Sequence, residues 1–210
     1  MEIFDFPQGS PEWHAIRAGL PTASEFSTVM AKGKTAGSES VTRRKYMLRL
    51  AGETLTGEPE QTYSNGFMER GKEWEPEARN LYAFLYSCEP KQVGFIRSGN
   101  KGCSPDALIG DDGMLELKSA IPSVLIDLFL RDTFPSEHLA QCAGNLWVAE
   151  RQWIDIAVYH PKLPLFVKRL NRDGQLESYI RNMADEVERF NTELAATVER
   201  IRGYASARAA

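Results

Sequence analysis

Hydrophobic residues recur every three or four positions along three long stretches of the chain, the spacing of amphipathic helices. The stretches cover residues 41–57, 64–87 and 175–202. Pro76 lies inside the second stretch, where it must occupy a first turn or mark a kink. The residues predicted to face inward are Tyr46, Leu50 and Leu55 in the first stretch, Phe67, Trp74, Ala78, Leu81, Tyr82 and Leu85 in the second, and Leu176, Tyr179, Ile180, Met183, Val187, Phe190, Leu194, Val198 and Ile201 in the third.

Shorter helices are predicted where capping residues precede brief apolar runs. Ser10 and Pro11 supply one helix start, and residues 22–25 supply a second. A further helix is predicted over residues 136–149. Residues 32–40 (KGKTAGSES) are small and polar and show no periodicity, which predicts a surface loop.

Strands are predicted where short runs are rich in β-branched and aromatic residues or alternate between apolar and polar positions. These runs are residues 92–98, 106–110, 114–119, 153–160 and 165–170, and a turn is expected at 171–174. Residues 110–113 (GDDG) predict a tight turn that folds two of the runs into a hairpin. Because strands and helices are mixed along the chain, we predict an α/β or α+β fold with a central mixed sheet flanked by helices.

The composition is that of one globular domain spanning residues 1–210. With 42% hydrophobic and 26% charged residues, the chain can bury a core without disulfides or structural metals. Its three cysteines have no C-x-x-C spacing, so neither a disulfide framework nor a zinc or iron–sulfur cage is indicated. No signal-peptide pattern or membrane span is evident, and we expect a cytoplasmic protein. The net charge of −4 leaves nucleic-acid binding open, because such binding depends on local patches.

The predicted hairpin carries the strongest chemical signal in the sequence. Its turn brings Asp106 and Glu116, ten positions apart, within reach of one cation, and strand alternation points Lys118 to the same side as Glu116. Two carboxylates can hold Mg²⁺, which takes oxygen ligands and keeps coordination positions for substrate phosphate oxygens. With a lysine to orient the nucleophile or balance charge, such a site suits phosphodiester hydrolysis.

Ordinary structural roles are the alternative for each of these residues. Asp106 after Pro105 can cap a turn, and Glu116 with Lys118 can form a solvent-facing pair on an edge strand, because an E-x-K spacing is common. A calcium-binding loop is excluded, since the D-x-D-x-D-G spacing of an EF-hand is missing. The combination of Pro-Asp, a turn and apolar-Glu-apolar-Lys, preceded by a helix that bears Glu75, favours the functional interpretation.

Four motifs lie in order between Trp13 and about Tyr159. They are WHAIRAGLPTASEF, RGKEWEPEAR, SPDALIGDDGMLELK and EHLAQCAGNLWV. Together they resemble the motifs of the phage lambda-type exonucleases, also called YqaJ-like viral recombinases or alkaline exonucleases, within the PD-(D/E)xK nuclease superfamily. The resemblance implies a restriction-endonuclease-like core and a metal-dependent exodeoxyribonuclease.

The resemblance also implies roles for individual residues. Asp106 and Glu116 match metal-binding acids, and the backbone carbonyl of Leu117 matches a third metal ligand. The metal would be Mg²⁺, replaceable by Mn²⁺, with two ions expected. Gln141 matches a glutamine near the active site, although its helix position also suits a solvent-facing residue. The catalytic residues implied in this way are Glu75, Asp106, Glu116, Lys118 and Gln141.

Arg17 and Ser24 match residues that hold a 5′-terminal phosphate. Chemistry supports the pairing, because a guanidinium offers a fork of donors to phosphate oxygens and a hydroxyl at a helix start adds another. Taken alone, they would be a surface arginine and a helix cap. Lys32 and Lys34 belong either to a plain surface loop or to a segment that follows the DNA backbone.

The function expected from this resemblance is digestion of linear double-stranded DNA from a 5′-phosphorylated end, which leaves 3′ single-stranded tails for recombination. The family further implies a homotrimer ring around DNA and a phage single-strand annealing protein as partner, in the cytoplasm of a bacterial host. Two alternatives are a PD-(D/E)xK endonuclease of a restriction or repair system and a DNA-end-binding module without cleavage. A CRISPR-associated nuclease with an iron–sulfur cluster is disfavoured, since it requires four cysteines.

Overall fold

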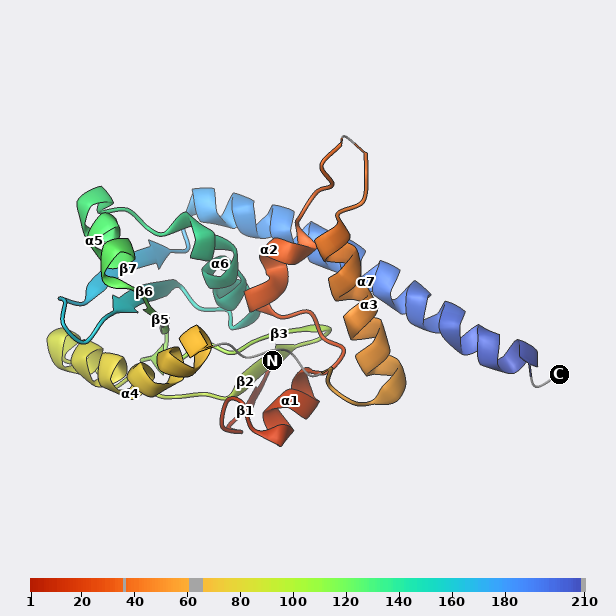
Figure 1. The fold of residues 1–210 in the computed structure, drawn as a ribbon, viewed down its shortest axis with the longest axis horizontal. Helices are drawn as coiled ribbons and strands as arrows, with labels where there is room; N and C mark the ends of the chain where they lie inside the picture. The colour runs from red at the N-terminus through yellow and green to blue at the C-terminus, as the bar shows by residue number, and fades with distance from the viewer. Residues whose placement is uncertain (36, 61–65, 209–210) are drawn as a thin grey trace.

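The computed structural model describes residues 1–35, 37–60 and 66–208, which form two β-sheets surrounded by helices (Figure 1). The mixed sheet predicted from the sequence is confirmed, with strand order β4-β5-β6-β7. A second, antiparallel sheet has the order β1-β2-β3. The strands are β1 (Glu2–Phe4), β2 (Phe95–Ser98), β3 (Lys101–Cys103), β4 (Ala107–Ile109), β5 (Gly113–Ser119), β6 (Trp153–Tyr159) and β7 (Phe166–Asn171).

The predicted hairpin is present as β4 and β5, which pair antiparallel with Ala107 opposite Leu115. Gly110 adopts a φ of 52° at the turn, a left-handed conformation that glycine tolerates without a Cβ clash. Strand β5 then pairs parallel with β6. A parallel pair needs a crossover, and here it consists of α5 (Pro122–Arg131), the 3₁₀ turn η2 (Ser136–His138) and α6 (Leu139–Val148).

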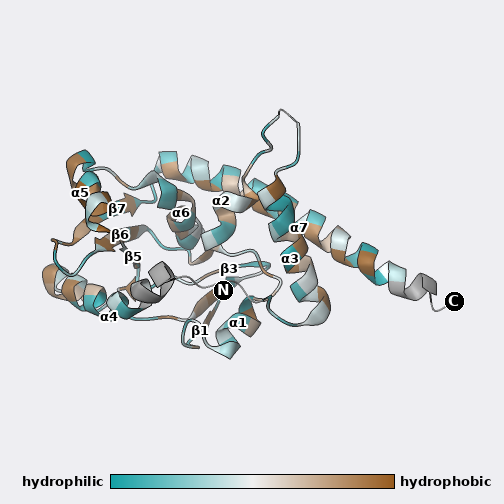
Figure 2. Ribbon diagram, viewed as in Figure 1, coloured by the Kyte–Doolittle hydropathy of each residue, from teal (hydrophilic) through white to brown (hydrophobic). Residues whose placement is uncertain are grey.

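Helices cover both faces of the mixed sheet (Figure 1). One face packs against α4 (Gly66–Tyr86), and the buried cluster between them includes Ala78, Tyr82, Leu115 and Leu117. The opposite face is covered by α6 and, beyond it, by the long α7 (Gly174–Arg208). Hydrophobic residues concentrate on the inner strands and on the sides of the helices that meet them (Figure 2). The β4–β5 hairpin is therefore enclosed between two layers of helix.

The N-terminal region contributes α1 (Pro11–Arg17), the 3₁₀ turn η1 (Ala23–Glu25), α2 (Phe26–Val29) and α3 (Val41–Thr56). Ser10 caps α1 by accepting a hydrogen bond from the backbone N–H of Trp13 at 3.2 Å, and Pro11 follows at the first helical position. Ser40 caps α3 in the same way. These caps confirm the helix starts predicted near Ser10 and Val41.

Several details differ from the sequence predictions. Leu55, Leu85 and Ile201 were predicted to face inward but are 37%, 54% and 47% exposed, because each lies near a helix end that extends past the core. Pro76 lies in the interior of α4, on its exposed side, and neither begins nor ends the helix. The side chain of Phe67 lies outside the described residues. Helix α5 was not predicted at all.

Strand β5 also departs from the alternating pattern assigned to it. Residues 113–117 are all buried, because α4 covers one face of the strand and α6 covers the other. The predicted turn at 171–174 shortens to two residues, since Asn171 ends β7 and Gly174 begins α7. Within the described ranges, no helix has the length and hydropathy to cross a membrane.

Candidate active site

Glu116 lies at the centre of the candidate active site. It sits on β5, is only 2% exposed and points toward α6. Its Oε1 accepts hydrogen bonds from Lys118 Nζ at 2.7 Å and from Gln141 Nε2 at 2.5 Å. Its Oε2 accepts one from Asn145 Nδ2 at 3.0 Å. The buried carboxylate therefore has donors at both oxygens, as a charged group out of water requires.

Asp106 immediately precedes β4, and the register of the hairpin places it across from Glu116. Its Oδ2 accepts a hydrogen bond from the backbone N–H of Leu117 at 2.5 Å. Burial, together with the negative charge of Glu116, raises the pKa of Asp106 well above its usual range, although Lys118 acts in the opposite direction. Two carboxylates held close together in this way disfavour joint ionisation unless a cation is added.

Lys118 contributes the positive charge of the site. Burial by itself would lower the pKa of this lysine, but the neighbouring carboxylates of Glu116 and Asp106 outweigh burial, and the pKa lies above its ordinary value. The ammonium therefore stays charged at physiological pH. About 28% of the side chain is exposed, so it can still reach a molecule that enters the site.

A cavity of about 530 Å³ opens beside these groups and gathers nearly all the residues predicted for catalysis and phosphate binding. Gly71 and Ser119 approach closely at its rim, where α4 meets the end of β5. The predicted residues that line it are Arg17, Ser24, Glu75, Asp106, Glu116, Leu117, Lys118 and Gln141. Segments separated by more than a hundred residues in the sequence therefore line one cavity.

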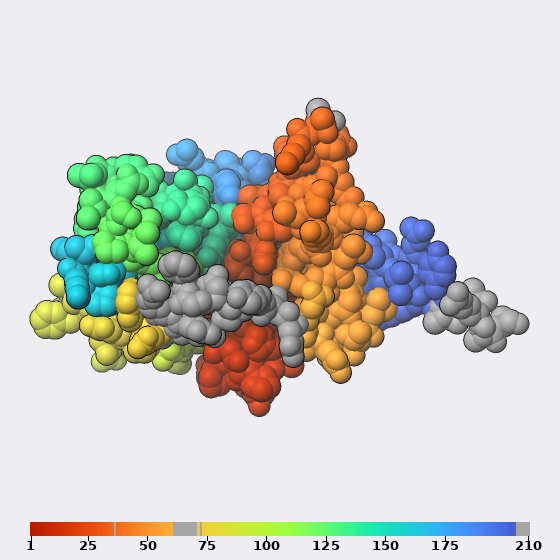
Figure 3. All heavy atoms as spheres, in the orientation of Figure 1, coloured from red at the N-terminus to blue at the C-terminus, as the bar shows by residue number. Residues whose placement is uncertain are grey.

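Lys32 and Lys34 do not take part in this cavity. The loop that carries them projects from the body of the molecule on either side of residue 36 (Figures 1 and 3), and both side chains are exposed. They line neither this cavity nor the larger one beside it. Any contact they make with DNA would therefore be outside the site.

Glu75 lies on α4 at the edge of the cavity. Its carboxylate pairs with Arg79 one helical turn away, and its charge helps to raise the pKa of Asp106. Pro76 follows it in an unbroken helix, so the proline does not displace the acid from the site. Glu75 is thus placed on the rim of the cavity, beyond the close contacts that surround Glu116.

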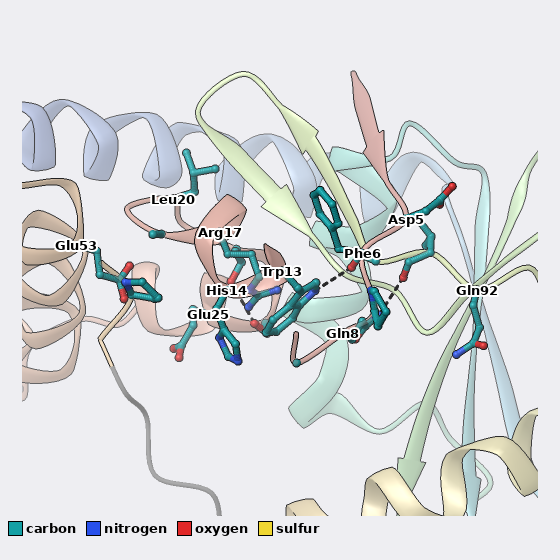
Figure 4. Close-up of a pocket in the computed structure, with 18 of the residues that line it drawn as sticks. Asp5, Phe6, Gln8, Trp13, His14, Arg17, Leu20, Glu25, Glu53 and Gln92 are labelled. Atoms are coloured by element: carbon teal, nitrogen blue, oxygen red, sulfur yellow. Dashed lines mark hydrogen bonds between the residues drawn. The ribbon is translucent and has the colours of Figure 1, made fainter. Parts of the chain in front are cut away.

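Arg17 forms the other end of the cavity. Its Nη1 donates to Ser104 Oγ at 2.9 Å, and its guanidinium lies 3.9 Å from the centroid of the Trp13 ring. Figure 4 shows Arg17 beside Trp13, where a second cavity of about 1140 Å³ begins. Burial lowers the pKa of Arg17 to about 10. Among the described residues, no carboxylate forms an ion pair with this guanidinium, so it can accept an anion.

Two residues of the site were not predicted from the sequence. Ser104 binds both Arg17 and the indole N–H of Trp13, the latter at 3.0 Å. Asn145 is 1% exposed and binds Glu116. Ser104 belongs to the same motif as Asp106, and Asn145 shares a helix face with Gln141. Their positions in the sequence therefore pointed to the site, but their residue types did not.

The donor set fits a hard divalent cation. Asp106 and Glu116 supply carboxylate oxygens, and Leu117, which follows Glu116 on β5, also lines the cavity. In the described part of the chain, no cluster of three or more His, Cys, Asp or Glu side chains is placed to hold a metal ion. Mg²⁺ commonly binds through one or two carboxylates and leaves the remaining positions for water and phosphate.

A mixed sheet that places Pro-Asp and Glu-x-Lys side by side in a cavity defines the class of PD-(D/E)xK nucleases. The chain belongs, more particularly, to the family of the YqaJ-like viral recombinase domain, whose model matches residues 12–152. This assignment confirms the resemblance found in the sequence, and it makes the protein an exodeoxyribonuclease of the lambda-type alkaline exonuclease family.

Solved structures agree with this family. An alkaline exonuclease (LHK-Exo) from Laribacter hongkongensis is 32% identical with a TM-score of 0.83, and the alignment covers 94% of this chain and 98% of that chain. The same enzyme in complex with dAMP is 33% identical with a TM-score of 0.81 over the same shares. A phage-related exonuclease from Haemophilus somnus 129PT, 12% identical with a TM-score of 0.60 over 88% and 98% of the two chains, shares the fold. No curated protein sequence matches the chain.

Proposed function

We propose that the protein is a Mg²⁺-dependent 5′-to-3′ exonuclease that degrades one strand of linear double-stranded DNA from a 5′-phosphorylated end. The observation that carries the proposal is the one cavity that joins Asp106, Glu116 and Lys118 to the guanidinium of Arg17, which forms no ion pair with any described carboxylate. Acids and a lysine suit phosphodiester hydrolysis, and an arginine without a carboxylate partner suits a terminal phosphate. The 3′ tails left behind would serve recombination by strand annealing.

Asp106, Glu116 and the carbonyl of Leu117 would hold the metal. When bound, Mg²⁺ supplies Lewis-acid stabilisation of the charge that develops on the phosphoryl oxygens and activates water for attack. Burial and the charge of Glu116 raise the pKa of Asp106, and a cation between the two carboxylates would relieve the repulsion that is the second of these causes. Mn²⁺ is the expected substitute, and a stoichiometry of two ions remains a prediction for calorimetry.

The remaining polar groups act on the substrate and on the nucleophile. The ammonium of Lys118, whose pKa is raised by Glu116 and Asp106, can stabilise negative charge on the scissile phosphate or orient the attacking water. Gln141 anchors Glu116 through its amide nitrogen and lines the cavity, where it can also contact that water. Glu75 would assist from the rim, either by binding a second ion or by ordering its waters.

End recognition would depend on Arg17 and Ser24. Both line the catalytic cavity and also the larger cavity shown in Figure 4, so they lie where the two spaces meet. A terminal phosphate seated there would place the first phosphodiester near the acids. The structure of LHK-Exo in complex with dAMP supports a deoxynucleoside monophosphate as the released product.

We also propose that three copies assemble into a ring around DNA and that a phage single-strand annealing protein binds the enzyme in the bacterial cytoplasm. The apolar surface of α5 supports self-association, because Val124, Ile126 and Leu130 are 44%, 49% and 81% exposed. Sedimentation velocity measures the number of copies, and Leu130→Glu is expected to lower it. A monomer for both the parent protein and the Leu130→Glu variant would contradict the ring.

The decisive experiment is digestion of linear duplexes labelled at either end. Each duplex is prepared with a 5′-phosphate or a 5′-hydroxyl and incubated with Mg²⁺ or with a chelator, and a closed circular plasmid serves as a control. The expected result is loss of mononucleotides from phosphorylated 5′ ends only when Mg²⁺ is present. Cleavage of the circle would favour the endonuclease, and binding without cleavage would favour the end-binding module.

A further inference from the structure

The hydrogen bonds around Glu116 are distributed unequally between its two oxygens. Lys118 and Gln141 both donate to Oε1, whereas Oε2 receives a hydrogen bond from Asn145. Rotation of the carboxylate about its Cγ–Cδ bond moves both oxygens away from their donors. The contact at Oε2 therefore adds a second, independent restraint on the plane of the carboxylate to those at Oε1.

Asn145 is placed for this contact by α6. It lies one helical turn after Gln141, so both amides project from the same face of the helix toward β5. The side chain is 1% exposed and lines the catalytic cavity. Because a carboxylate can only accept, the amide must present its nitrogen to Glu116, which fixes the orientation of the Asn145 side chain as well.

We propose that Asn145 is a positioning residue that holds the Glu116 carboxylate in its metal-binding orientation and thereby sets the affinity of the site for Mg²⁺. This inference rests on the proposed role of Glu116 as a metal ligand. Groups that hydrogen-bond to ligating carboxylates restrict their rotation, and loss of such a partner typically weakens metal affinity about 10- to 100-fold.

The position of the contact gives Asn145 a different role from that of Lys118. Lys118 is partly exposed and charged, so it is available to the substrate. Asn145 is buried and neutral, and it donates a hydrogen bond to Glu116. Asn145 therefore acts through Glu116. A change at Asn145 should alter metal binding first and turnover only as a consequence.

The test is calorimetric titration of the DNA-free protein with Mn²⁺, used as the probe ion. Asn145→Leu keeps a similar volume but removes the donor, and the expected result is a dissociation constant for Mn²⁺ raised about 10- to 100-fold. The half-saturating Mg²⁺ concentration for cleavage should rise by a similar factor, while kcat recovers at saturating Mg²⁺. Asn145→Ala is the second variant, in case the leucine prevents folding.

Val148→Ala is the matched control, because Val148 is a fully buried residue of the same helix that forms no hydrogen bond to Glu116. It should lower the melting temperature and leave the dissociation constant for Mn²⁺ unchanged. If either asparagine variant binds Mn²⁺ as tightly as the parent protein and only melts earlier, Asn145 is merely structural and the inference fails.

Glu116→Gln separates a failure of this inference from a failure of the proposed function. If Glu116 is a metal ligand, this substitution abolishes the heat of Mn²⁺ binding. If Mn²⁺ still binds to Glu116→Gln with parental affinity, Glu116 is not a ligand and the proposed metal site is wrong. Loss of binding in Glu116→Gln together with parental affinity in both Asn145 variants would overturn only the role of Asn145.

Discussion

Arg17 is predicted to serve function at a cost in stability. Its guanidinium is half-buried, stacks on Trp13 and donates to Ser104, but in the described part of the chain no carboxylate forms an ion pair with it. A cation in this position is desolvated without compensation by an opposite charge. Replacement by methionine keeps the length and apolar body of the side chain and removes the charge. We therefore expect Arg17→Met to lose end recognition without losing stability.

The pKa of Arg17 sets the scale of the stability effect. Burial lowers it from 12.5 to about 10, and each pKa unit corresponds to about 1.4 kcal/mol. A cation whose folded pKa is depressed destabilises the fold at every pH below that pKa, here by up to about 3 kcal/mol. Loss of the hydrogen bond to Ser104 and of the Trp13 contact offsets about 1 to 3 kcal/mol of this gain. The melting temperature should thus stay constant or rise by a few degrees.

The functional effect should be much larger. Charge-assisted hydrogen bonds to a phosphate contribute about 1.5 to 3 kcal/mol, so the preference in kcat/KM for 5′-phosphorylated over 5′-hydroxyl duplexes should fall about 10- to 100-fold. The assay compares the two duplexes at equal Mg²⁺, and melting is followed by circular dichroism. Arg44→Met is the control, because Arg44 is 59% exposed and pairs with Glu39 at the surface. A destabilised Arg17→Met that keeps its end preference would refute the reasoning.

Three further substitutions test separate parts of the structure. Lys118→Ala should abolish cleavage and leave DNA binding intact in fluorescence anisotropy, and unchanged turnover would remove Lys118 from the mechanism. Asp106→Ala should eliminate the heat of Mn²⁺ or Mg²⁺ binding in calorimetry, and a persistent signal would place the metal elsewhere. Tyr82→Phe removes the 2.6 Å hydrogen bond to buried Asp155, which retains its hydrogen bonds from Arg169. Urea unfolding should show a free energy of unfolding lowered by about 1 to 3 kcal/mol, with no change in kcat. An unchanged free energy of unfolding would show that the hydrogen bond from Tyr82 to Asp155 does not stabilise the fold.

The catalytic hairpin was predictable because its signal is local. A Pro-Asp pair, a glycine turn and an apolar strand with Glu and Lys two positions apart determine both the register and the neighbours of Asp106. The sequence did not show that β5 is buried on both faces. Strand alternation alone suggests one solvent-facing side, and only the packing of α4 and α6 places Glu116 in the interior.

The unpredicted features depend on contacts between distant segments. Asn145 lies 29 positions from Glu116, and Ser104 lies 87 positions from Arg17, so local spacing could not pair them. Helix α5 was missed for a different reason. Its sequence, PSVLIDLFLR, is short and mostly apolar, and a short apolar run does not by itself distinguish a helix from a buried strand.

The proposed sites of end recognition and catalysis meet on one loop of the protein. Arg17 and Trp13 both bind Ser104, and Gln8 donates to the carbonyl of Pro105 at 3.1 Å. Asp106 follows directly, so the Cα atoms of Ser104 and Asp106 are at most about 7 Å apart. Because proline restricts the backbone between them, a shift of the proposed phosphate pocket would move Asp106 with it. A DNA end held by Arg17 would therefore present its nearest phosphodiester to the acids, which favours removal of single nucleotides over cleavage at a distance.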